Sequence, residues 1–183
     1  MFKVIIFILI FLFSGCQNLS LKMRTETGAG VPLFIGKLAG ESGSGKKIDL
    51  YYFSSKIGKD VYSIGDFTFN LYAGGALFVP LSREKSNVYS FIIEPGVYYT
   101  GWYFYPYLSA DLGLSLMDKP SWKYQSTYMN FIVNGNLGVK FPVSEKFSWY
   151  LGYKFFHLSN ARVELPNKGY NTDILLTGIE FDF

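Results

Sequence analysis

The sequence predicts an all-β fold, an eight-stranded antiparallel barrel that spans a membrane, and three observations support it. Apolar and polar side chains alternate over segments of about ten to sixteen residues, longer than most strands of soluble sheets. The 183 residues include 18 Phe and 15 Tyr, more than the core of one small soluble domain needs. After residue 16, no run approaches the roughly 18 consecutive apolar residues of a membrane-spanning helix. Strands must therefore cross the membrane.

The composition excludes several classes of partner. Lys and Arg number 17 against 14 Asp and Glu, and no basic run is present, so no nucleic-acid partner is expected. The single cysteine cannot form an intramolecular disulfide. One histidine without clustered thiols or carboxylates predicts no metal site, and we expect no cofactor.

The first 15 residues are typical of a bacterial export signal. Lys3 precedes an apolar stretch over residues 4–13, and the small residues Ser14 and Gly15 follow it. The same stretch resembles a lipoprotein signal that would make Cys16 the lipidated first mature residue, although Phe13 stands where that motif prefers Leu, Val or Ile. Ordinary cleavage nearby is the alternative. Residues 16–183 then form a single outer-membrane barrel domain.

Eight segments carry the strand pattern. A first strand is expected within residues 31–40, and the others are expected at residues 46–55, 66–79, 87–99, 102–117, 127–141, 147–158 and 171–183. In residues 127–141, Phe131 and Val133 share one face while Asn134 and Asn136 share the other. Aromatic and aliphatic side chains facing outward around a polar interior are typical of a transmembrane barrel and not of a lipocalin-like soluble barrel.

The connection lengths predict the orientation. The short turns at residues 100–101 and 142–146 suit the periplasmic side, whereas the longer segments 80–86, 118–125 and 161–170 suit the outside. Residues 57–65 would make an unusually long periplasmic loop. The terminal Phe183 resembles the aromatic residue with which barrels of the bacterial outer membrane end, so we expect that localisation.

Polar residues interrupt the apolar face of the strand at residues 147–158. Its odd positions continue past Phe155 to His157 and Ser159, on the surface expected to face lipid. Unpaired polar groups there cost free energy. A histidine and a serine on one face can act as base and nucleophile in acyl transfer, although an undistorted strand separates them by roughly 6.5 to 7 Å. The alternative is that both merely mark where the strand leaves the bilayer.

Two segments resemble a known family. Residues 156–161 (FHLSNA), followed by 166–171 (PNKGYN), are similar to the signature of the outer-membrane lipid A 3-O-deacylases, and residues 106–114 (PYLSADLGL) resemble a second block of that family. The resemblance implies an eight-stranded barrel with a lipid-facing active site. It also implies hydrolysis of the ester between a 3-hydroxyacyl chain and the 3-position of a lipid A glucosamine. The expected partners are lipid A, or lipopolysaccharide, as substrate and membrane lipid.

The resemblance assigns roles to individual residues. It makes Ser159 the nucleophile, His157 the general base and Asn160 part of the oxyanion hole. Asn171 occupies the position of the family's acid that orients the histidine, and an amide oxygen can still accept a hydrogen bond from the imidazole. Asp173 is the rival, because it would lie beside His157 if residue 159 were opposite residue 171.

Two other functions stay open at this stage. A non-catalytic outer-membrane barrel with a structural or adhesion role shares the same strand pattern. A soluble-type barrel with a ligand in its lumen is disfavoured by the inward Asn and Lys residues. The sequence also permits a homodimer.

Overall fold

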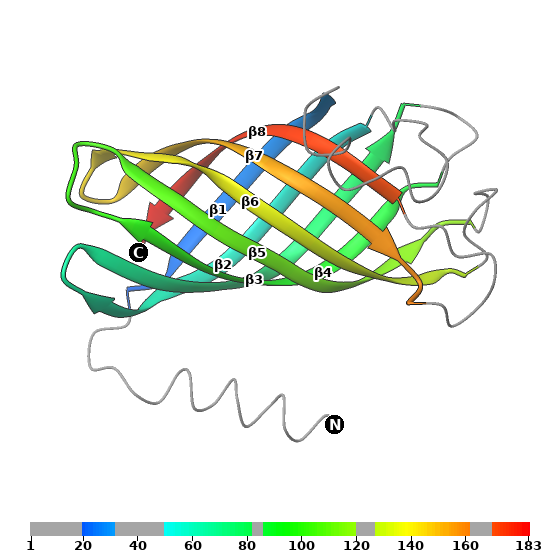
Figure 1. Cartoon of the computed structure of the whole chain (residues 1–183), viewed down its shortest axis with the longest axis horizontal. Coiled ribbons are helices and arrows are strands. Elements are labelled where there is room, and N and C mark those ends of the chain that lie inside the picture. Colours follow the sequence, from blue (N-terminus) through cyan, green and yellow to red (C-terminus); the bar gives the residue numbers. More distant parts are fainter. Residues whose placement is uncertain (1–19, 32–49, 82–85, 120–126, 162–169) are drawn as a thin grey trace, which may run out of the picture.

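The described residues form a closed barrel of eight antiparallel strands (Figure 1). The computed structural model describes residues 20–31, 50–81, 86–119, 127–161 and 170–183. The strands are β1 (Lys22–Val31), β2 (Leu50–Ile64), β3 (Phe67–Pro80), β4 (Val88–Tyr99), β5 (Tyr105–Met117), β6 (Met129–Ser144), β7 (Phe147–Ser159) and β8 (Tyr170–Asp182). Each strand pairs with its neighbour in sequence, and β8 pairs with β1, which leaves the sheet without an open edge.

The two ends of the barrel differ. The turn at Gly65, the bend over residues 101–104 and the turn at residues 145–146 lie at the end where β8 finishes (Figure 1). At that end Lys22 is opposite Asp182, and the N–H of Phe183 donates to the carbonyl of Leu21 (2.9 Å). Because β7 runs away from its tight turn with β6, Ser159 lies at the opposite end of the wall.

Alternating side chains give the barrel an apolar outside. Large exposed apolar side chains occur on all the strands from β2 to β8. Among them are Phe53, Tyr89, Phe91, Leu108, Leu114, Phe131, Leu151 and Leu175. A surface of this kind is stable against lipid and not against water. The aromatic excess of the sequence is thus largely the lipid-facing wall.

Paired charges fill the lumen. The guanidinium of Arg24 donates to Glu94 (2.9 Å), Glu180 (3.2 Å) and Tyr150 (3.0 Å). Lys56 binds Glu26 (2.7 Å), and all of these side chains are buried. Buried charges are tolerated when they are paired and hydrogen-bonded, as here. A ligand could enter this lumen only by displacing these paired side chains. A binding or catalytic site is therefore more compatible with the outer wall of the barrel.

The first strand differs from its prediction. It was expected within residues 31–40 but is Lys22–Val31, and residues 32–49 are outside the described part. Its lumen face carries Lys22, Arg24 and Glu26, while its outer face carries Thr25 and Thr27 in place of aromatic residues. Apart from Met23, these positions are polar or small, so no sustained apolar alternation marks the strand. The lumen ion pairs stabilise it instead.

The expected long loop at residues 57–65 is also wrong. β2 continues to Ile64 and meets β3 at a tight turn, where Gly65 has a φ of 56°. A register shift between Asp60 and Tyr62 reverses the alternation, which hides the strand from a pattern of period two. Asp60 forms an ion pair with Lys22 (2.5 Å).

The predicted export signal at residues 1–15 and the lipidation site Cys16 lie outside the described residues. The described part of the chain contains no helix of the length and apolarity that crossing a membrane requires.

Candidate active site

His157 and Asn171 meet on neighbouring strands at the end of the barrel far from Phe183. They are directly opposite each other in the β7–β8 ladder. Nδ1 of His157 lies 2.6 Å from Oδ1 of Asn171, and both side chains are partly buried. The amide oxygen has no hydrogen, so Nδ1–H of His157 is the donor. In the neutral ring this leaves the lone pair on Nε2, the nitrogen that can accept a proton.

Ser159 is the last residue of β7 and lies opposite Phe131 of β6. The side chains of Tyr153, Phe155, His157 and Ser159 are all partly exposed, whereas the residues between them are buried. His157 and Ser159 therefore share the outer face of the wall, as the alternation predicts. An enzyme that used them would act on a molecule in the surrounding lipid.

Asn160 follows β7 directly and is 1% exposed. The next residue, Ala161, has a φ of 52°, in the left-handed region that residues with a side chain rarely adopt. Strained backbone of this kind is common near functional sites.

Asp173 does not lie beside His157. The alternative requires residue 159 to be opposite residue 171, but the observed register differs from that by two residues and puts Asp173 opposite Phe155. Its carboxylate accepts a hydrogen bond from the hydroxyl of Tyr153 and is buried. The long segment between the two strands leaves their register free, so it is set by packing elsewhere, such as Phe147 against Phe181 (5.1 Å between ring centroids).

Asn134 contacts His157 from the lumen side. The backbone N–H of His157 donates to Oδ1 of Asn134 (3.2 Å), and Nδ2 of Asn134 donates to Asp111 (2.9 Å). Lys154 forms a buried ion pair with the same carboxylate. Strand alternation predicts Asn134 only as a lumen residue, and no spacing in the sequence indicates its contact with His157.

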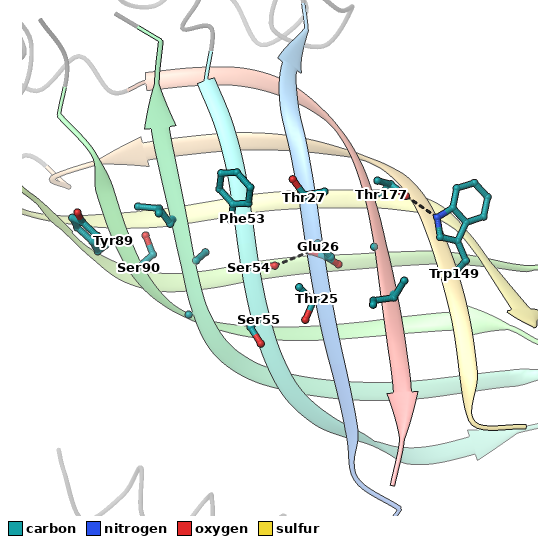
Figure 2. Close-up of a pocket in the computed structure, with 15 residues that line it drawn as sticks. Thr25, Glu26, Thr27, Phe53, Ser54, Ser55, Tyr89, Ser90, Trp149 and Thr177 are labelled. Carbon is teal, nitrogen blue, oxygen red and sulfur yellow. Dashed lines mark hydrogen bonds between the residues drawn. The ribbon is translucent and has the colours of Figure 1, made fainter. Parts of the chain in front are cut away.

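A surface groove lies away from these residues. It has a volume of about 810 Å³ and is lined from β1, β2, β3, β4, β7 and β8, by residues that include Thr25, Phe53 and Trp149 (Figure 2). Trp149 donates to the hydroxyl of Thr177 there (2.8 Å). Neither His157 nor Ser159 lines this groove. Across the described residues, no three His, Cys, Asp or Glu side chains group as a metal site would require.

Solved structures resemble the whole barrel. The crystal structure of the outer-membrane enzyme PagL aligns with a TM-score of 0.62 at 18% identity, covering 86% of this chain and 97% of that chain. Neisserial surface protein A aligns at 0.54 and 16% identity, covering 90% and 96%. The N-terminal barrel domain of Pseudomonas aeruginosa OprF aligns at 0.53 and 16%, covering 91% and 100%. At these identities the likeness establishes the fold, an outer-membrane β-barrel.

A family model supplies the relationship by sequence. The model of the lipid A 3-O-deacylases (PagL) matches residues 47–180, which include every strand from β2 to β7 and most of β8. No curated protein matches the chain by sequence. The match covers well over half of the chain and confirms the family that the two segments of sequence suggest. The chain therefore belongs to the lipid A 3-O-deacylase (PagL) family of outer-membrane ester hydrolases.

Proposed function

We propose that Ser159 and His157, at the end of β7, carry out the lipid A 3-O-deacylase reaction, and that Asn171 orients His157. The observation that supports this most strongly is the 2.6 Å contact between Nδ1 of His157 and Oδ1 of Asn171. It fixes the ring with its proton-accepting nitrogen available, on the same strand face as the serine hydroxyl.

The first step acylates the enzyme. Nε2 of His157 takes the proton from Oγ of Ser159 as that oxygen attacks the ester carbonyl carbon at the 3-position of the glucosamine. The tetrahedral intermediate collapses with cleavage of the bond between the acyl carbon and the sugar oxygen. His157 returns its proton to that oxygen, and the sugar leaves with a free 3-hydroxyl.

The second step releases the fatty acid. A water molecule gives a proton to His157 as its oxygen attacks the acyl-Ser159 ester. Collapse of the second intermediate restores the Ser159 hydroxyl with the proton from His157 and frees a 3-hydroxy fatty acid. Together the two half-reactions regenerate the free enzyme, and neither needs a metal or cofactor.

Asn160 is proposed to support the oxyanion hole. It follows the nucleophile directly, and the next residue, Ala161, has a φ of 52° in the left-handed region. Preorganised donors at such a position typically contribute 10²- to 10³-fold in kcat, about 2.7 to 4 kcal/mol.

The position on the wall suits an amphipathic substrate. The apolar side chains Phe131 and Phe155 adjoin the site on β6 and β7, where an acyl chain would lie. With the termini on the periplasmic side, the end of β7 is at the level of the outer leaflet, whose lipid A presents its acylated sugars there.

Neither a structural or adhesion role nor a homodimer explains the arrangement of His157. A purely structural or adhesion barrel has no use for a histidine ring oriented on the lipid-facing wall. The homodimer that the sequence permits is not required, because a single chain supplies all the proposed residues.

The test is release of fatty acid by the purified, folded protein. We expect wild type to convert lipid A to its 3-O-deacylated form with one equivalent of free 3-hydroxy fatty acid, measured by gas chromatography. Ser159→Ala and His157→Ala should each reduce the rate by at least about 10³-fold while still folding. Equal release by wild type and Ser159→Ala would overturn the assignment.

A further inference from the structure

The β6–β7 ladder is interrupted at His157. The strands pair at Ile132–Leu158 and again at Gly135–Phe155, but the two intervening positions, including that of His157, are not paired. At this interruption the N–H of His157 donates to the Asn134 side chain (3.2 Å). A side-chain amide thus binds an N–H that an unbroken antiparallel ladder would direct to a main-chain carbonyl.

The Asn134 amide is itself fixed in orientation. Its side chain is 1% exposed, and its Nδ2 donates to the carboxylate of Asp111 (2.9 Å), which also pairs with Lys154. If the amide were flipped, its oxygen would face a carboxylate and its NH₂ would face an N–H. Both contacts would be lost, so the buried ion pair keeps Oδ1 directed at His157.

We propose that Asn134 is a positioning residue that holds the backbone of His157 for proton transfer with Ser159. An undistorted strand would separate the Cα atoms of residues 157 and 159 by roughly 6.5 to 7 Å, so a direct hydrogen bond between their side chains depends on the local backbone and on the rotamers. A local departure from the ladder can bring the two side chains closer, and Asn134 holds the His157 backbone at that departure. Asn171 orients the ring from β8 while Asn134 orients the main chain from β6. This inference rests on the proposed roles of His157 and Ser159.

The chain offers a matched control two residues along the same strand. Asn136 is also buried in the lumen, and its Nδ2 donates to the same Asp111 carboxylate (2.9 Å) and to Ser109 (3.0 Å). None of its hydrogen bonds among the described residues reaches His157. Asn136→Ala therefore disturbs the same buried cluster without removing the contact under test.

The experiment compares Asn134→Ala and Asn136→Ala with wild type, using purified full-length protein corrected for its folded fraction by heat-modifiable gel migration. Kinetics on lipid A give kcat and KM, and labelling by a fluorophosphonate probe gives the reactivity of Ser159. For Asn134→Ala we expect kcat and the labelling rate to fall about 10- to 100-fold with KM within about twofold, because the proton acceptor is displaced while lipid binding is not. Hydrogen exchange at the His157 amide should accelerate in this variant alone.

Two results would overturn the proposal. One is an Asn134→Ala protein whose kcat stays within about twofold of wild type. The other is an equal loss of kcat in Asn136→Ala, which would assign the effect to the Asp111 cluster as a whole. Failure of the proposed function is a separate outcome, since wild type would then be no more active than Ser159→Ala.

Discussion

Oδ1 of Asn171 lies 2.6 Å from Nδ1 of His157 and accepts its hydrogen. An amide oxygen can fix the tautomer of the ring as a carboxylate does. It stabilises the imidazolium less, because it carries no full charge. We therefore expect Asn171 to support catalysis by His157, but less effectively than a carboxylate would.

Removing the acceptor should impair catalysis. Asn171→Ala leaves Nδ1 without its partner, so the ring can adopt the wrong tautomer or rotate. We expect kcat for lipid A deacylation to fall about 10²-fold with little change in KM. Asp173→Ala is the control, since Asp173 lies opposite Phe155 and binds Tyr153, and its activity per folded molecule should stay within about twofold. Full activity in Asn171→Ala combined with loss in Asp173→Ala would reverse the assignment.

Restoring a carboxylate should raise activity. Asn171→Asp keeps the size of the side chain and adds a negative charge that stabilises the imidazolium formed when Ser159 loses its proton. We expect kcat to rise at least about tenfold, measured under the same conditions as wild type. A lower kcat in folded Asn171→Asp protein would indicate that charge at this position does not assist proton transfer.

The charged lumen should dominate stability. Arg24 bonds Glu94 and Glu180, and Arg24→Leu would leave two buried carboxylates without this partner. We expect a loss of about 3 to 5 kcal/mol in the free energy of unfolding, measured by urea titration of the barrel in lipid vesicles. Asp182→Asn removes a partly exposed charge 3.8 Å from Lys22 and should cost no more than about 1 kcal/mol. Equal costs would argue against the lumen network as the main stabilising element.

A charged residue on the lipid-facing wall should destabilise the barrel more strongly near the middle of the bilayer than near its edge. Leu112 is 50% exposed in the middle of β5, and Leu112→Arg should destabilise the barrel in a bilayer by about 2 to 4 kcal/mol. Val143, near the turn end of β6, is also exposed, and Val143→Arg should cost no more than about 1 kcal/mol. The same urea titration measures both. A tolerated arginine at Leu112 would mean that this face does not lie in the hydrocarbon layer.

Most of the fold could be predicted because lipid on one side and a polar lumen on the other impose a period of two on every strand with an apolar face. β3 and β6 show this most clearly, and both were predicted to within a few residues. β1 could not be found in this way, because lumen charges alternate there with small outer residues. The end of β2 was missed for another reason, since a bulge reverses its alternation.

The site could be predicted only in part. Alternation places His157 and Ser159 on the outer face, and the family resemblance identifies Asn171. The pairing of His157 with Asn171 depends on the β7–β8 register, which the long intervening segment leaves undetermined. The contact from Asn134 depends on an interruption in the β6–β7 ladder, for which the sequence has no signal.

The most direct test of the account is mass spectrometry of lipid A from cells that produce the wild-type protein or Ser159→Ala at equal levels in the outer membrane. The account predicts a lipid A species lighter by one 3-hydroxyacyl group with the wild type, and unmodified lipid A with Ser159→Ala. Identical spectra from the two strains, whether modified or not, would contradict it.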